Sequence, residues 1–161
     1  AYNQKSYQLI SPLLMNSDGT LQNSIRLLPN FFDFIIRFIN PTHKKYKIVK
    51  NKVFSVPFIH GACYLIKLDD LKSINFFDER FFLYCEDLDL CRKIIESKGL
   101  IAVDQNIKVT HLYNKQSHRS LKLFFVHIRS IIQYFLKWGL FNNLKNQITN
   151  KKFIDYLDET K

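Results

Sequence analysis

Three acidic residues, Glu86, Asp87 and Asp89, lie close together among apolar and aromatic neighbours. A stretch this apolar is expected to be buried, and a buried carboxylate is costly unless it is paired, hydrogen-bonded or needed for chemistry. A carboxylate directed into a cleft can act as a general base and remove a proton from an attacking hydroxyl group. At the start of a helix, the same charges can instead cap free N–H groups and match the helix dipole. Capping is favoured for Asp89, and one of the adjacent pair Glu86 and Asp87 is expected to face the cleft.

Asp87-Leu88-Asp89 also has the DxD spacing that can hold a divalent metal against a diphosphate. Such a motif normally follows a buried strand and sits in a loop. Here it falls inside a helical pattern, in which residues i and i+2 face apart. We therefore do not interpret this triplet as the metal motif.

Two further positions are candidates for contacts to an anion or a metal. His111 ends a predicted strand, and strand ends are where open α/β sheets place site residues. It is either a satisfied structural group or a ligand of a metal or diphosphate. His118 and Arg119 follow in a polar segment that opens the longest predicted helix, where an anion could bind.

The elements that must position these residues alternate between strands and helices. Strands are predicted at 8–11, 21–26, 53–59, 61–67, 100–103 and 107–112, and helices at 31–39, 70–74, 86–98 and 117–139. Pro12 is expected to end the first strand, Asp69 to cap the second helix and Gly99 to end the third. Residues 43–52 are expected to form an exposed loop, and residues 141–161 a polar tail with a short helix near Phe153. This order predicts an α/β fold with a mixed sheet and flanking helices.

Composition narrows the class of protein. The 161 residues suffice for one domain, and the net charge is +10, with nine Lys or Arg and no acid between Gln105 and Ile154. A basic surface implies an anionic partner, such as a membrane surface or a phosphorylated substrate. No nucleic-acid-binding motif is present, so nucleic acid is not expected as a partner. No signal peptide or bilayer-spanning run is visible, and three cysteines without zinc spacing indicate free thiols in a reducing compartment.

Several segments together resemble the C-terminal half of a family 2 glycosyltransferase, in the rhamnosyltransferase-like subgroup of bacterial O-antigen and capsule assembly. The resemblance extends over roughly residues 7 to 140 and is carried by Ser11–Gln22, Gly61–Ile66, Phe76–Cys91, Gly99 and Val109–His111. It implies the acceptor-side portion of a GT-A fold at residues 1–140, ending in a long amphipathic helix. It also implies inverting transfer from a nucleotide-diphosphate sugar to a lipid-linked or saccharide acceptor, usually with Mg²⁺ or Mn²⁺.

The resemblance also suggests roles for individual residues. It makes Asp87 the base that deprotonates the acceptor hydroxyl and Glu86 the residue that orients the acceptor. Gly61 and Ala62 would line the acceptor side. The later histidine, His111, would reach the metal or diphosphate. Asp89, His118 and Arg119 are taken as substrate-binding candidates.

Two departures from the family pattern matter. The N-terminal strands that bind the nucleotide and carry the main metal ligands have no counterpart, so we expect a fragment that is inactive in isolation. Just before Gly61, the subgroup often has Asp-Trp where this chain has Pro57 and Phe58. The alternative hypothesis is a non-catalytic module that binds a partner chain or an anionic membrane. We expect a cytoplasmic location under either hypothesis, with a peripheral position on the inner face of the plasma membrane left open.

Overall fold

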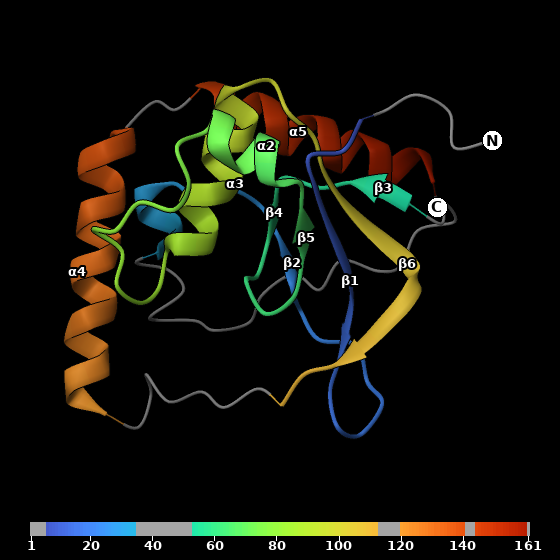
Figure 1. Cartoon of the computed structure of the whole chain (residues 1–161), viewed down its shortest axis with the longest axis horizontal. Coiled ribbons are helices and arrows are strands. Elements are labelled where there is room, and N and C mark those ends of the chain that lie inside the picture. Colours follow the sequence, from blue (N-terminus) through green and yellow to red (C-terminus); the bar gives the residue numbers. More distant parts are fainter. Residues whose placement is uncertain (1–5, 35–52, 113–119, 141–143, 161) are drawn as a thin grey trace.

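The computed structural model describes residues 6–34, 53–112, 120–140 and 144–160 (Figure 1). Its main sheet has four strands in the order β3-β6-β1-β5. β1 (Leu9–Met15) and β6 (Ile101–Thr110) pair in parallel, whereas β5 (Leu65–Ile66) and β3 (Val53–Ser55) pair antiparallel with them on the two sides. A second, antiparallel ladder joins β2 (Ile25–Arg26) to β4 (Phe58–Ile59). The predicted α/β fold with a mixed sheet is confirmed.

The helices that flank the sheet are α2 (Leu68–Ser73), α3 (Glu86–Glu96), α4 (Leu121–Trp138) and α5 (Leu144–Glu159). α3 buries Leu88, Leu90, Cys91 and Ile94 in the core, as its helical spacing predicts. α4 stands at one edge of the molecule, and β6 curves along the opposite side (Figure 1). The candidate acids at the start of α3 therefore lie between the sheet and α4.

Gly99 was expected to end α3, but the helix ends before it. The helix ends at Glu96, and Lys98, with a φ of 63°, takes the left-handed conformation expected for the glycine. The N–H of Gly99 still donates to the carbonyl of Ile94 at 2.8 Å. A Cβ on Gly99 would lie 1.5 Å from the side-chain oxygen of Gln8. The φ of Gly99 is not positive, and a methyl group at this position would require the side chain of Gln8 to move.

The long central strands were predicted in pieces. β1 continues through Pro12, and its register against β6 shifts between Pro12 and Leu13. A register shift tolerates the missing N–H of proline, so Pro12 does not end the strand. β6 runs unbroken where two strands were predicted. Conversely, the stretch 53–59 divides at Pro57 into β3 and β4, which belong to different sheets.

Several smaller predictions were also wrong in part. Within 61–67 only Leu65 and Ile66 are extended, and Leu65 is exposed. α2 begins at Leu68 after Lys67, so Asp69 lies inside the helix and does not cap it. Residues 31–34 are helical, while the rest of that predicted helix and the loop 43–52 lie outside the described residues.

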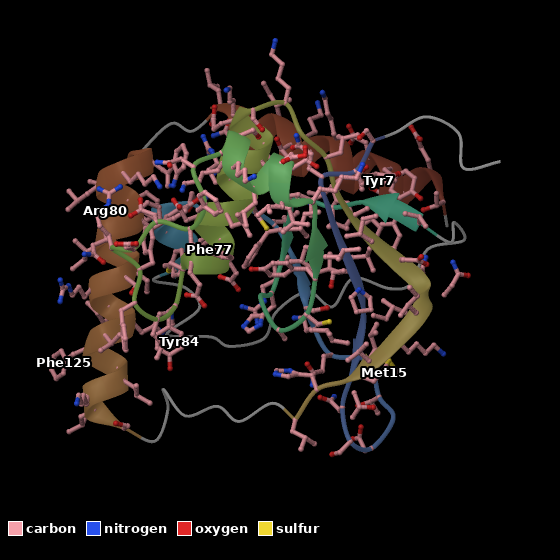
Figure 2. The ribbon with its side chains drawn as sticks, viewed as in Figure 1. Tyr7, Met15, Phe77, Arg80, Tyr84 and Phe125 are labelled. Atoms are coloured by element: carbon pink, nitrogen blue, oxygen red, sulfur yellow. The ribbon has the colours of Figure 1, made fainter. Side chains whose placement is uncertain are left out.

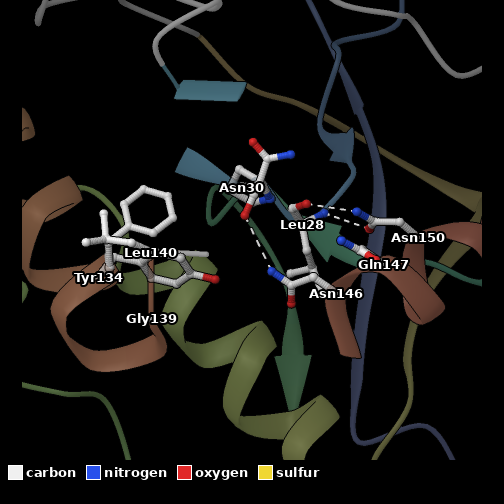
Figure 3. Close-up of a pocket in the computed structure, with 10 residues that line it drawn as sticks. Leu28, Asn30, Tyr134, Gly139, Leu140, Asn146, Gln147 and Asn150 are labelled. Carbon is white, nitrogen blue, oxygen red and sulfur yellow. Dashed lines mark hydrogen bonds between the residues drawn. The ribbon is translucent and has the colours of Figure 1, made fainter. Parts of the chain in front are cut away.

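The C-terminal segment is an integral helix and not a polar tail. α5 has 16 residues, and its Phe153 is 4% exposed within the core. The side chain of Asn150 accepts from the N–H of Leu28 at 2.9 Å and donates to the carbonyl of Leu28 at 2.8 Å (Figure 3). This pair of hydrogen bonds fixes α5 to the segment that follows β2.

Candidate functional site

The site is built around a contact between Asp87, in the first turn of α3, and the turn after β4. One carboxylate oxygen of Asp87, Oδ2, accepts from the backbone N–H of Gly61 at 2.8 Å. The other, Oδ1, accepts from the backbone N–H of Leu88 at 2.7 Å. A Cβ on Gly61 would lie 2.8 Å from the Cβ of Asp87, so only glycine permits this approach. Two of the residues that the family resemblance singled out are thus in direct contact.

Asp87 was expected to project into an open cleft, but its side chain is buried. It is only 8% exposed, because the Gly61 turn packs across it. Each oxygen accepts one amide hydrogen, whereas a carboxylate oxygen can accept two. The amides fix the orientation of the group and leave capacity for one further donor on each oxygen.

Glu86 is partly buried beside Asp87. Its Oε2 atom is buried and has no hydrogen-bond partner among the described residues. Burial, and secondly the negative charge of Asp87, raise the pKa of Glu86. A buried acceptor without a donor is costly, so this oxygen has an unmet need that a substrate hydroxyl could satisfy.

The chain enters α3 through a strained turn. Tyr84 and Cys85 have φ values of 68° and 64°, in the left-handed region that residues with a side chain rarely adopt. α4 holds this turn: Ser130 Oγ donates to the carbonyl of Leu83 at 2.7 Å, and the His127 ring contacts Tyr84 at 4.5 Å between centroids. The direction in which Glu86 and Asp87 project therefore depends on α4.

Asp89 was predicted as a substrate-binding residue, and this prediction is wrong. It is 1% exposed, and its carboxylate accepts from Lys137 Nζ and, at 2.7 Å, from Trp138 Nε1. Lys137 also bonds Asp78 at 2.7 Å. A carboxylate buried against α4 in this way is inaccessible to a substrate. Asp89 has a structural role, but it binds side chains of α4 and does not cap α3 as was expected.

His111 lies at the end of β6, as predicted. Its N–H donates to the carbonyl of Met15 at 2.9 Å, and its Nδ1 lies 3.1 Å from Gln22 Oε1. No group of three His, Cys, Asp or Glu residues within the described ranges is arranged to hold a metal ion. These residues therefore do not form a metal centre by themselves.

Two basic residues that were not predicted as site residues are His60, which directly precedes Gly61, and Arg26, whose charge acts on His60. Burial lowers the pKa of His60, while the charge of Asp87 raises it and those of Arg26 and His111 lower it. Asp87, Arg26 and His111 thus lie close enough to His60 to influence its charge. Arg26 Nε is buried with no hydrogen-bond partner in the described part of the chain. Nothing in the sequence around Arg26 pointed to it, since β2 is only two residues long.

The remaining candidates are less defined. Ala62 is partly exposed, and its N–H donates to the carbonyl of His60 at 2.8 Å, which closes the turn over Asp87. His118 and Arg119 lie outside the described residues, so their predicted anion contacts stay predictions.

The amino-acid sequence was compared with those of known proteins. The chain is similar to rhamnosyltransferases. It is 30% identical over 125 residues to rhamnosyltransferase WbbL of Escherichia coli (strain K12), a match that covers 74% of this chain and 47% of that protein. It is 24% identical over 111 residues to N-acetylglucosaminyl-diphospho-decaprenol L-rhamnosyltransferase of Mycobacterium tuberculosis (strain CDC 1551 / Oshkosh), covering 63% of this chain and 36% of that protein. No protein-family model matches the chain.

These matches cover only part of each relative. The chain spans about half the length of WbbL and about a third of the mycobacterial protein. The similarity supports a rhamnosyltransferase-like glycosyltransferase. Across the described ranges, every helix is too short or too polar to cross a lipid bilayer.

Proposed function

We propose that this chain is the acceptor-binding and base-bearing part of an inverting, family 2 glycosyltransferase of the GT-A type. The enzyme would move a sugar from a nucleotide-diphosphate donor to a hydroxyl of a lipid-linked or saccharide acceptor in cell-surface polysaccharide synthesis. The contact between Gly61 and Asp87 carries the proposal, because it holds a carboxylate in one orientation next to the turn that follows β4. The similarity to rhamnosyltransferases supports it and suggests rhamnose as the first sugar to test.

In the proposed reaction Asp87 removes the proton from the acceptor hydroxyl. The oxygen of that hydroxyl attacks the anomeric carbon of the donor sugar. A new carbon–oxygen bond forms, the bond to the diphosphate breaks, and the nucleotide diphosphate leaves with the electron pair. The amides of Gly61 and Leu88 hold the carboxylate in one orientation during the transfer.

Glu86 orients the acceptor in this proposal. Its buried Oε2 can accept from a second sugar hydroxyl, which gives that atom the donor it lacks among the described residues. Arg26 Nε, also unpaired there, offers a donor to an anionic or hydroxyl oxygen in the same region. Asp89 takes no part, since α4 uses its carboxylate.

The divalent metal stays an expectation for the complete enzyme. Mg²⁺ or Mn²⁺ would stabilise the departing diphosphate, and His111 is the residue of this chain that we expect nearest to it. The described residues do not hold a metal by themselves, so none of the steps above depends on one. We likewise expect the nucleotide-binding part of the site to be contributed by residues outside this sequence.

A non-catalytic module is the second candidate, and one observation favours it. Asp87 is 8% exposed and both its oxygens already accept backbone amides, which is also how a purely structural carboxylate looks. In that case the Gly61 contact would serve only to join β4 to α3. The two candidates differ in whether Asp87 affects turnover more than it affects stability.

Asp87→Asn, compared with Asp104→Asn, separates these candidates. Asp104 is also 8% exposed and accepts the backbone and side-chain N–H groups of Asn106, but it lies on β6. Both variants should lose roughly 1–3 kcal/mol of stability, because an amide cannot accept as many hydrogen bonds as a carboxylate. The rate of rhamnose transfer from its nucleotide-diphosphate donor is then measured. The assay uses the native protein together with any further polypeptide that forms the complete enzyme. We expect loss of transfer by about a hundredfold or more for Asp87→Asn alone. Activity within a few-fold of the parent would overturn the assignment.

A further inference from the structure

α4 carries an apolar stripe on the side that faces away from the protein. Leu121, Phe125, Ile132 and Leu136 are 79%, 67%, 53% and 77% exposed. At 3.6 residues per turn, these four positions fall within roughly 60° of one another around the helix. We call this set the α4 stripe. Phe125 projects outward from the edge of the molecule (Figure 2).

The opposite side of the same helix is the one that faces the core. Ser130, Ile131, Tyr134 and Phe135 are buried there. This helix was expected to be a long amphipathic one, and the structure divides its apolar residues between the core and the solvent. Large apolar side chains gathered in one exposed patch mark a surface that a partner covers.

Charge identifies the kind of partner. The 18 residues of α4 contain Lys122, Arg129 and Lys137 and no acidic residue. Lys122 and Arg129 are exposed and follow the α4 stripe on one side of the helix, whereas Lys137 is committed to Asp78 and Asp89. An apolar stripe bordered by cations suits a surface of anionic lipid headgroups above acyl chains.

We propose that α4 lies on an anionic membrane surface, with the α4 stripe inserted at the boundary of headgroups and acyl chains and with Lys122 and Arg129 at the phosphates. This deepens the proposed function, on which it rests, because a lipid-linked acceptor would be held in that same surface. The inner side of α4 holds the turn before Glu86 through Ser130 and His127. One helix thus joins the lipid surface to the candidate acids.

Vesicle flotation of the native protein tests the proposal. The probes are vesicles of phosphatidylcholine alone and vesicles that also contain phosphatidylglycerol, each at low and at high sodium chloride. We expect binding at least about tenfold stronger to the anionic vesicles at low salt, with most of the difference lost at high salt. Equal binding to both vesicle types, or none to either, would overturn the proposal.

Matched variants assign the binding to α4. Phe125→Ser with Leu136→Ser should abolish it, whereas Ile107→Ser with Ile154→Ser, at exposed apolar positions on β6 and α5, should leave it unchanged. Lys122→Gln with Arg129→Gln should weaken it more than Lys151→Gln with Lys152→Gln on α5. Circular dichroism checks that each variant is folded.

Two outcomes would point elsewhere and overturn the membrane proposal. If light scattering shows a dimer that the Phe125 and Leu136 changes dissolve, the α4 stripe is a self-association surface. If the control pairs reduce vesicle binding as much as the α4 pairs, the attraction is only a general effect of net charge. Vesicle binding needs neither donor nor acceptor sugar, so its failure is distinguishable from failure of the proposed transfer.

Discussion

The backbone amide of Gly61 donates to Oδ2 of Asp87 at 2.8 Å, and a single added methyl group at Gly61 would sit 2.8 Å from the Cβ of Asp87. Two residues separated by 26 positions are thus in contact with no space between them. The requirement for glycine at position 61 follows from Asp87, since the φ of Gly61 is not in the left-handed region.

Gly61→Ala should therefore displace Asp87 and lower transfer far more than it lowers stability. A shift of the carboxylate by even a fraction of an ångström disturbs its alignment with a hydroxyl. Gly99→Ala is the control, because a methyl group there meets the side chains of Gln8 and Ile94, away from the site. Rate measurements and urea unfolding on both variants make the comparison. Equal ratios of activity loss to stability loss would show that Gly61 serves packing alone.

Glu86→Gln tests the electrostatic cost of the paired acids. Burial and the charge of Asp87 raise the pKa of Glu86, so the folded protein holds this proton more tightly than the unfolded chain does. The resulting stability is fully present below a pH of about 4.3 and is lost as the pH rises through the raised pKa. The variant stays neutral, so it should melt at a higher temperature than the parent at pH 7 and at a similar temperature at pH 4. Exposed Glu79→Gln should show no such crossover; a Glu86→Gln protein that melts lower at pH 7 would contradict this account.

His60 should make the protein sensitive to acid in the opposite direction. Burial lowers its pKa, and the charges of Arg26 and His111 add to this while Asp87 opposes it. The folded state thus favours the neutral ring. Its contribution to stability is present above a pH of about 6.5 and is lost as the pH falls through the lowered pKa.

Between pH 6.5 and 5 we therefore expect the parent to lose stability more steeply than His60→Gln. Thermal unfolding gives the two slopes, and NMR titration of the ring protons of His60 gives the direction of its shift independently. A ring that titrates above the ordinary histidine value would mean that Asp87 outweighs burial.

Lys137→Met should be among the most destabilising changes in α4. It leaves Asp89, which is 1% exposed, with Trp138 as its close hydrogen-bond donor and with Lys93 at 3.8 Å. Removing one partner of a buried pair costs about 3–5 kcal/mol. Lys122→Met, at an exposed site on the same helix, should change the unfolding free energy by less than about 0.5 kcal/mol.

Denaturant unfolding of Lys137→Met, Asp89→Leu and the double variant measures the coupling. The double variant should be less destabilised than the sum of the single ones, because it leaves no unpaired buried charge. Strict additivity would show that the two charges do not depend on each other.

Much of the central fold was readable from hydrophobic periodicity. α3 was predicted to within two residues because its apolar residues, Leu88 and Cys91 among them, repeat at helical spacing, and both of these are buried. Strand ends were predicted poorly, since Pro12 is tolerated at a register shift and Pro57 marks the passage between two sheets. Neither outcome is encoded locally, because the partner strand decides it.

The site itself was only half visible in the sequence. Motif resemblance selected Gly61 and Asp87, but their contact through a backbone amide depends on the packing of β4 on α3. Asp89 was misassigned because its partners, Lys137 and Trp138, are 48 and 49 residues away. The left-handed turn at Tyr84 and Cys85 was missed because no glycine announces it, and α4 supplies the contacts that hold it.

The position of Lys137 and Trp138 has a consequence for biosynthesis. A ribosome makes α3 well before it makes the last turn of α4, so the nascent chain carries Asp89 without the two donors that it needs once buried. Until those residues emerge, the most favourable place for this acid is in water. The inner surface of α3 can therefore close only at a late stage of synthesis, and a ribosome that stalls before Lys137 releases a polypeptide in which the candidate acids are present but the contacts that hold α3 are missing.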